Sequence, residues 1–211
     1  LIQFNNQNIL IDSSPDLRAQ LLKNKIKSID KVFYTHLHAD QTHGINDLRP
    51  FFLMNKKQIP VFADNTTSKY LNSTFKYCFE TSQDYPSTLN LNKLKKKHIF
   101  RNKNKRIIIE SIPTEHGKIE SICYLINKRL AYASDISSFY KKDYKKLNKL
   151  DYLIVDCLRY KNHSSHFNLD QVLELAKILS PKKTVLTNMH SDLDYEQLKK
   201  KLPKNIIPGY D

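Results

Sequence analysis

Cysteine and glycine are scarce in this chain of 211 residues, which contains three of each. Cys78, Cys123 and Cys157 lie far apart, and none belongs to a Cys-x-x-Cys pair of the kind that redox and zinc sites use. Their odd number gives no support to a disulfide framework. We therefore interpret the cysteines as small buried hydrophobic residues of a protein from the reducing cytoplasm.

Long apolar runs are also missing. No stretch of 18 apolar residues occurs, so we expect neither a membrane-spanning segment nor a membrane partner. The N-terminus shows no signal-peptide pattern. However, the chain opens at Leu1 directly into the strand-like LIQFNNQNILID and stops after IIPGYD. We therefore expect a fragment clipped at both ends, for which missing targeting signals carry little weight.

Acidic residues are outnumbered, with 21 Asp and Glu against 35 Lys and Arg, a net charge of +14. The run KLKKKHIFRNKNKR, residues 93–106, has no acidic residue at all. Such a run can attract phosphate-bearing partners, but it is more often a solvated loop, and we favour that interpretation. Aromatic residues do not interleave with the basic ones densely enough to indicate a nucleic-acid groove. Nucleic acid remains open as a partner but is not favoured, and a homodimer is left open.

Apolar runs bounded by polar turns predict strands at residues 8–12, 31–35, 59–63, 106–112, 121–126, 129–134, 152–156 and 183–188. Helical patterns lie between them, at residues 14–24, 46–55, 67–79, 137–147, 168–179 and 194–202. Residues 125–130 predict an antiparallel hairpin that turns through Asn127 and Lys128. Strands therefore alternate with helices in some places and pair directly in others. This arrangement predicts an α/β sandwich of mixed sheets with helices outside, formed by residues 1–211 as a single domain.

Aspartate and histidine recur at or just after the ends of the predicted strands. These residues are Asp12, His36, His38, Asp40, His116, Asp135, His166 and His190. A single buried histidine is usually only a hydrogen-bonded core residue, but so many at equivalent places predict a site at one sheet edge. Two of the three glycines, Gly44 and Gly117, directly follow histidines of this set of motifs. We expect an unusual dihedral or a close backbone approach at both.

The segment THLHADQTHG, residues 35–44, concentrates these side chains. His36 and His38 are two positions apart, so their imidazoles share one side of an extended loop, and Asp40 can join them or lie beside them. Imidazole and carboxylate together are the ligands of zinc, manganese and iron. An aspartate such as Asp135 can bridge two cations about 3.5–4 Å apart.

The segment HLHADQ resembles the His-x-His-x-Asp-His signature of the metallo-β-lactamase-fold hydrolases, and His116, Asp135 and His190 follow in that family's order. Further motifs resemble the branch that includes the phosphoribosyl cyclic phosphodiesterase (PhnP-like). These motifs are LIDSSPDLRAQLL, HADQTHGINDLRP, TEHG, YASDIS and NMHSDLDY. Ribonuclease Z is a more distant relative. The resemblance extends over residues 1–211. It implies a four-layer αββα sandwich with two mixed β-sheets, outer helices, and a preceding strand and Gly-rich loop in full-length members.

The resemblance also implies a centre of two divalent metal ions, zinc or manganese. Carried over by position, the ligands would be His36, His38 and His116 for the first ion, Asp40 and His190 for the second, and Asp135 as the bridge.

Two further residues receive roles from the same resemblance. Asp12 would support the ligand loop by hydrogen bonds. His166 matches a histidine that lies near the substrate in the phosphodiesterase branch, where it would act as an acid or base. Asp40 and His166 are therefore the expected catalytic residues.

Gln41 departs from the family pattern, which has a histidine there as a ligand of the second ion. A glutamine offers only a neutral carbonyl oxygen, a weak ligand for zinc but acceptable for a harder ion such as manganese. Three alternatives stay open: a second site of lower affinity that uses Gln41 or water, an enzyme that needs one metal, or a binding domain without activity. We favour the first, and we rank a domain without activity last because all the other ligands are intact.

These residues predict a cytoplasmic, metal-dependent hydrolase. We expect a phosphodiesterase that opens a small cyclic or nucleotide-like phosphate with a metal-activated hydroxide. Its partner would be a small phosphate-containing substrate. The alternatives are an RNA-processing nuclease of the ribonuclease Z type, which the basic charge suggests, and a catalytically weakened metal-binding domain, which Gln41 suggests.

Overall fold

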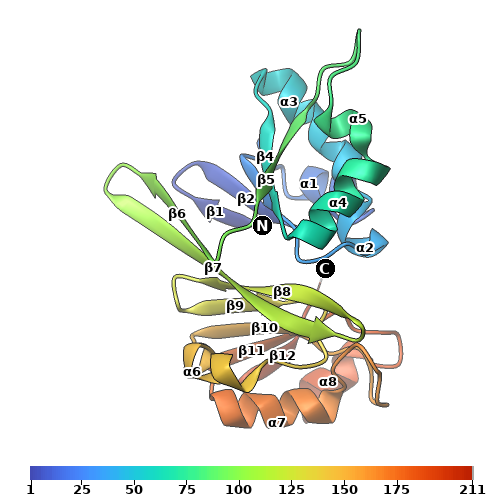
Figure 1. The fold of residues 1–211 in the computed structure, drawn as a ribbon. Coiled ribbons are helices and arrows are strands. Elements are labelled where there is room, and N and C mark those ends of the chain that lie inside the picture. Colours follow the sequence, from blue (N-terminus) through green and yellow to red (C-terminus); the bar gives the residue numbers. More distant parts are fainter. Residues whose placement is uncertain (211) are drawn as a thin grey trace. The chain divides into compact units, whose positions relative to one another are not determined.

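A computed structural model describes residues 1–210 of the chain. The chain divides into two compact units, Leu1–Lys95 and the part that begins at Lys96 (Figure 1). Each unit contains one β-sheet and a hydrophobic core of its own.

The first unit holds a five-stranded sheet in the order β1-β2-β3-β4-β5. Its strands are β1 (Ile2–Phe4), β2 (Gln7–Ile11), β3 (Lys31–Phe33), β4 (Ile59–Ala63) and β5 (Leu89–Lys93). β1 and β2 pair antiparallel, and the remaining neighbours pair parallel, so the sheet is mixed. Parallel neighbours need crossover connections, and helices supply most of them in this unit.

The helices of the first unit are α1 (Leu17–Lys23), α2 (Ala39–Thr42), the 3₁₀ turn Ile45–Leu48, α3 (Arg49–Asn55), α4 (Asn65–Thr74) and α5 (Lys76–Phe79). Alternate residues of β4, namely Ile59, Val61 and Ala63, are buried. They pack in one core with Leu17 of α1 and Leu71 of α4. Alternate side chains of the strand point to one face of the sheet, and the apolar side chains of the helices pack against that face.

The second unit holds a seven-stranded sheet in the order β12-β11-β10-β9-β8-β7-β6. Its strands are β6 (Lys97–Asn102), β7 (Lys105–His116), β8 (Ile119–Ile126), β9 (Leu130–Ala133), β10 (Tyr152–Asp156), β11 (Lys183–Thr187) and β12 (Ile206–Pro208). Pairing is antiparallel from β6 to β9 and parallel from β9 to β12. This sheet is also mixed.

The helices of the second unit are the 3₁₀ turn Lys141–Asp143, α6 (Tyr144–Leu147), α7 (Leu169–Leu179) and α8 (Tyr195–Lys201). Leu147 of α6, Val172 of α7 and Leu198 of α8 belong to the core that covers one side of this sheet (Figure 1). α7 begins at a capping box, in which Asn168 and Gln171 each satisfy a backbone N–H of the other. The capping box stabilises the first turn of α7, the helix that carries the apolar stripe expected for residues 168–179.

The structure confirms most of the predicted elements. Strands 59–63 and 152–156 have the predicted ends. The hairpin through Asn127 and Lys128 is present between β8 and β9, and both residues have the positive φ of a tight hairpin turn. The predicted α/β class with two mixed sheets is therefore confirmed.

Three predictions were wrong in detail. The helix expected at 67–79 is interrupted at Phe75, which separates α4 from α5. The helix expected at 137–147 contains only a 3₁₀ turn and the short α6. The basic run 93–106 is not a loop but the end of β5, all of β6 and the start of β7. Alternation of apolar residues with lysine and arginine allows a strand here, because only one face needs to be buried.

None of the helices between residues 1 and 210 has the length and the apolar character needed to cross a bilayer. This agrees with the absence of a long apolar run in the sequence.

All three cysteines are free and buried, as the sequence predicted. Burial raises the pKa of Cys78 to about 11 and that of Cys157 to about 12, and it raises the pKa of Cys123 further. Thiolate is the reactive form, so these thiols are unreactive in the folded protein.

We expect Ellman's reagent at pH 8 to label well below one thiol per chain of the native protein over several minutes. After unfolding in guanidinium chloride, all three free cysteines should react at once. The absorbance of the released nitrothiobenzoate measures both. Rapid labelling of any cysteine in the native protein would contradict the burial of these side chains.

Candidate metal centre

Polar site residues of the first unit lie in the segment that follows β3. The strand ends at Phe33, and the chain then passes through Thr35, His36 and His38 before α2 begins at Ala39. Thr35 and His36 are fully buried, whereas His38 is exposed. The functional side chains therefore follow the C-terminal end of a parallel strand, as predicted.

Asp12 holds this segment through Thr35. The backbone N–H of Thr35 donates to Oδ1 of Asp12 at 2.7 Å, and the Thr35 hydroxyl donates to Oδ2 at 2.9 Å. Because the hydroxyl proton is used in this way, Thr35 Oγ1 accepts from Nδ1 of His36 at 3.0 Å. We therefore assign the proton of neutral His36 to Nδ1, which makes Nε2 the metal-binding nitrogen.

His36 and His38 face each other. Nε2 of His36 and Nδ1 of His38 are 3.0 Å apart, and the rings meet edge to face. Two nitrogens bound to one tetrahedral zinc at about 2.0–2.1 Å lie about 3.3 Å apart. Small side-chain movements would therefore let these two nitrogens share one ion, which matches the expectation from the His-x-His spacing.

Asp40 and Gln41 lie side by side on α2. Nε2 of Gln41 donates to Oδ2 of Asp40 at 2.9 Å. The amide therefore occupies one of the carboxylate oxygens that was predicted to bind the second ion. Both residues are near His38 in sequence, but the structure pairs them with each other.

Gly44, which ends the segment THLHADQTHG, lies at a position where only glycine fits. A Cβ atom at Gly44 would lie 1.9 Å from the backbone oxygen of Ser14, so no side chain fits. The N–H of Gly44 donates to the oxygen of Ser13, and the N–H of Ser13 donates to the oxygen of Gln41. The predicted close approach is confirmed, and it joins the segment after Asp12 to the ligand loop.

In the second unit, three strand ends and loops bring His116, Asp135 and His166 together. His116 is the last residue of β7, and Asp135 follows β9 by two residues. One ligand atom from each of the three residues lies within 4.8 Å of the other two, in a group able to hold a metal ion. His116 and Asp135 are almost completely buried. The structure thus brings together three residues that are spread over 50 positions of the chain, from His116 to His166.

His116 is oriented by a backbone carbonyl. Its Nδ1 lies 2.7 Å from the oxygen of Ser165, which can only accept, so the ring proton is on Nδ1 and Nε2 is the ligand nitrogen. Gly117 makes this contact possible: its φ is +61°, and a Cβ there would lie 2.8 Å from Cβ of Ser165. This second predicted close approach is also confirmed.

His166 is held by a residue that the sequence interpretation did not select. Its Nδ1 lies 2.7 Å from Oδ2 of Asp156, the last residue of β10. Asp156 is completely buried, and burial raises the pKa of its carboxyl, while the contact with His166 opposes that rise. The position of an aspartate at the end of a buried strand was a signal that could have identified it.

Asn188 is the second residue that was missed. Its Nδ2 donates to Oδ1 of Asp135 at 3.1 Å and lies 3.5 Å from Oδ1 of Asp156. Asn188 has a φ of +59°, a conformation that asparagine tolerates better than most residues. An amide donor between two carboxylates lowers the cost of burying both.

His190 lies outside this group. Its side chain is 61% exposed, and its Nδ1 is 3.3 Å from Oδ1 of Asp192. Its backbone N–H donates to the oxygen of Leu158, which fixes the start of the loop after β11. The role of His190 as a ligand stays a prediction.

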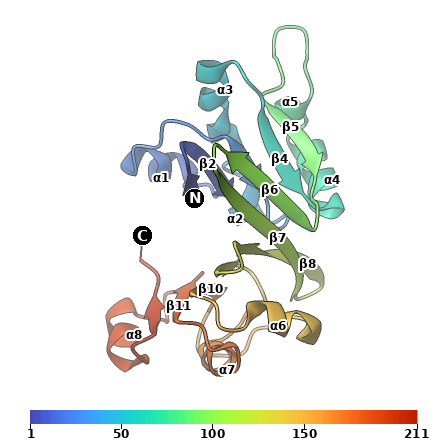
Figure 2. The same cartoon turned by 90° about the vertical axis from the view of Figure 1, so that its left-hand side faces the viewer.

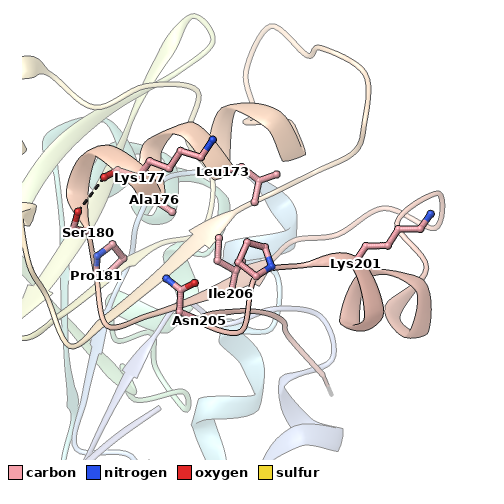
Figure 3. A pocket seen from close by; sticks show the side chains of 9 residues that line it. Leu173, Ala176, Lys177, Ser180, Pro181, Lys201, Asn205 and Ile206 are labelled. Atoms are coloured by element: carbon pink, nitrogen blue, oxygen red, sulfur yellow. Dashed lines mark hydrogen bonds between the residues drawn. The ribbon is translucent and has the colours of Figure 1, made fainter.

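A hollow of about 590 Å³ also occurs in the second unit, beside α7 (Figure 3). It is lined by apolar side chains of Leu173, Ala176 and Ile206, with Lys177 and Lys201 also present. None of the predicted site residues lines it, so it is distinct from the group of His116, Asp135 and His166.

The family model described as "Beta-lactamase superfamily domain" matches residues 7–189. The chain therefore belongs to this superfamily, and the predicted metallo-β-lactamase fold is confirmed. A solved structure described as a new diphosphatase from the PhnP family has a TM-score of 0.88 and 31% sequence identity, covering 99% of this chain and 79% of that one. The particular group within the superfamily is thus the PhnP family, the branch that the sequence motifs resemble.

Two further relatives match at the sequence level. The octanoyltransferase of Porphyromonas gingivalis is 30% identical over 208 residues, which are 96% of this chain and 41% of that protein. Ribonuclease Z of Prochlorococcus marinus is 32% identical over 74 residues, which are 33% of this chain and 24% of that protein. The matched residues cover less than half the length of either relative.

The link from Asp12 through Thr35 to His36 can be tested by replacing Thr35 with valine, which keeps the shape and removes the hydroxyl. We expect Thr35→Val to weaken zinc binding about 10- to 100-fold, because partners behind a ligand typically contribute that much to affinity. Isothermal titration calorimetry measures the affinity, and circular dichroism checks the fold.

Thr184→Val is the matched control. Thr184 is a buried threonine of β11 whose hydroxyl has no hydrogen-bond partner within residues 1–210. Equal zinc affinities of the two variants would show that the Thr35 hydroxyl does not orient His36.

Proposed function

We propose that the chain is a metal-dependent phosphodiesterase that opens a small cyclic or nucleotide-like phosphate ester. The observation that carries this proposal is the group of His116, Asp135 and His166, whose members converge in a chain of the PhnP family. The similarity to a diphosphatase of that family supports a phosphate ester or anhydride as the substrate class. The Nδ1 contacts of His36 and His116 support metal binding, because each presents Nε2 in the form that a metal requires.

The proposed metal ligands follow the family resemblance. His36, His38 and His116 would hold the first divalent ion and Asp40 and His190 the second, with Asp135 between them. Such ions lower the pKa of a water molecule and stabilise charge on phosphoryl oxygens, which supplies the nucleophile and much of the catalysis. Zinc suits this mixture of imidazole and carboxylate, and manganese suits it as well.

His166 is the proposed acid. Asp156 accepts from Nδ1, so Nε2 is the atom that would exchange a proton with the substrate. In its protonated form, His166 would donate from Nε2 to the alkoxide that leaves phosphorus. Asp156 holds the ring in one orientation, and Asn188 holds Asp135 beside it.

Asp135→Ala tests the proposed reaction. We expect wild-type protein to hydrolyse bis(p-nitrophenyl) phosphate or a ribose cyclic phosphate when manganese or zinc is added, and to lose activity with a chelator. Removing the carboxylate should lower kcat at least about 100-fold, because the two metal ions would lose the side chain that they are proposed to share. Release of p-nitrophenolate measures the rate.

The control for this variant is Asp170→Ala, which removes an exposed carboxylate from the first turn of α7 in the same unit. Its turnover should stay within about twofold of wild type, as is usual for exposed positions. Undiminished turnover of Asp135→Ala would exclude the proposed mechanism.

Gln41→His tests the second ion separately. We expect wild-type protein to hold its second ion weakly, because Gln41 offers a neutral oxygen and its amide nitrogen donates to Asp40. The histidine variant should retain more metal after dialysis and bind the second ion at least about 10-fold more tightly. Elemental analysis by mass spectrometry measures the stoichiometry.

Gln58→His, an exposed position of the same unit, is the matched control and should leave the metal content unchanged. If wild-type protein already retains two ions as tightly as Gln41→His, the substitution at position 41 has not weakened the second site.

A further inference from the structure

The basic run that was expected to be a loop forms an arm. β6 and the first part of β7 pair from Lys97 with Glu110 to Asn102 with Lys105. β7 pairs with β8 only from Ile109 onward. Residues 99–108 therefore form a two-stranded hairpin that extends past the end of β8, and Figures 1 and 2 show it as a ribbon.

One face of this hairpin collects positive charge. Arg101 and Arg106 are directly opposite each other, so their side chains point to the same face, which also carries Lys97. All three are exposed, as are Lys103 and Lys105 at the tip. On the other face, His98, Ile107 and Ile109 are buried. The outer face consists of Lys97, Ile99, Arg101, Arg106, Ile108 and Glu110, which lies opposite Lys97, and the tip lysines lie beside it.

Positive charge exceeds negative charge on this outer face, where Glu110, opposite Lys97, is the one carboxylate. Lys97, Arg101, Lys103, Lys105 and Arg106 take part in no ion pair within residues 1–210. Directly opposed like charges destabilise a sheet. An arginine pair in this position therefore costs stability unless an anion binds to it.

Protection of a sheet edge does not explain the pattern. β6 is an edge strand of the seven-stranded sheet, and lysine or arginine on an edge prevents association with other strands. That reasoning accounts for Lys97 and Arg101. It does not account for Arg106, which lies on the second strand directly opposite Arg101.

We propose that the outer face of the β6–β7 hairpin binds single-stranded nucleic acid through its phosphates. Two adjacent guanidinium groups are suited to phosphate oxygens, which they bind in a bidentate manner. Ile99, 45% exposed, and Ile108 lie between the cations of this face. An apolar pair there can contact the exposed bases of a single strand, whereas a duplex would present it only with phosphates.

This surface is separate from the proposed metal centre. Arg106 and His116 are on the same strand, ten residues apart, which corresponds to about 33 Å along an extended strand. A small phosphate ester cannot reach both. The proposal therefore goes beyond the proposed function and does not depend on it.

The test uses the 211-residue chain and a fluorescently labelled 20-mer of uridylate, with binding followed by anisotropy between 25 and 200 mM salt. We expect wild-type protein to bind, with an affinity that falls as salt increases. The double variant Arg101→Gln, Arg106→Gln should bind at least about 10-fold more weakly at 25 mM salt. Its salt slope should be smaller by about 1.4, because two phosphate contacts of a single strand are lost.

The matched control is Lys200→Gln, Lys204→Gln, which removes the same charge from exposed positions in α8 and just before β12. β12 and β6 are the two edges of one sheet, about 29 Å apart at about 4.8 Å per strand. This control should stay within about threefold of wild type. Lys103→Gln, a change at the exposed turn, should weaken binding without affecting strand pairing.

Several results would overturn the proposal. These are no binding of the 20-mer at 25 mM salt, equal losses in the hairpin variant and in the control, or duplex RNA bound as tightly as the single strand. Stronger binding to vesicles of phosphatidylserine and phosphatidylcholine than to the 20-mer would assign the surface to membranes instead. Turnover of the small phosphodiester should be the same in the wild type and the hairpin variant, so a failure of RNA binding leaves the proposed hydrolysis intact.

Discussion

Within each unit, the candidate site residues depend on hydrogen bonds that histidine Nδ1 atoms donate: His36 in the first unit, and His116 and His166 in the second. A neutral imidazole has a single N–H, so an acceptor at Nδ1 decides that Nε2 carries the lone pair. Thr35, backed by Asp12, is the acceptor for His36, and the carbonyl of Ser165 is the acceptor for His116. Asp156 is the acceptor for His166. These contacts fix the orientation and the proton position of each ring before any ligand binds, which lowers the free-energy cost of binding at its Nε2.

Each of these acceptors is placed by the fold of its own unit. Asp12 directly follows β2, and its backbone N–H donates to the oxygen of Phe33 in β3. Asp156 ends β10, which is paired on both sides by parallel strands. Because parallel strands end at the same edge, residues that follow different strands meet there without long loops. The two motif glycines then allow backbone segments to come closer than any side chain would permit.

Buried charge is the main cost of this arrangement. Asp135 and Asp156 are both almost completely buried and are joined by the amide of Asn188. Two carboxylates in such a place need hydrogen-bond donors, and Nδ1 of His166, 2.7 Å from Asp156, is one of them. The excess of positive charge over the whole chain does not serve this purpose, because its densest part is on the β6–β7 hairpin. The molecule therefore has two separate concentrations of charge: the buried carboxylates of Asp135 and Asp156, and the exposed cations of the β6–β7 hairpin.

The sequence by itself determined the class of fold and which residues are candidates for metal ligands. The His-x-His spacing, the aspartates and histidines that follow strands, and the glycines after His43 and His116 are local signals, and local signals are readable in one chain. Only the tertiary structure decided which acceptor orients which histidine, that Asn188 joins two carboxylates, and that the basic run folds into a hairpin with Arg101 opposite Arg106. Those facts depend on strand pairing and on loops packed against each other, so they follow from contacts between distant residues and not from spacing along the chain.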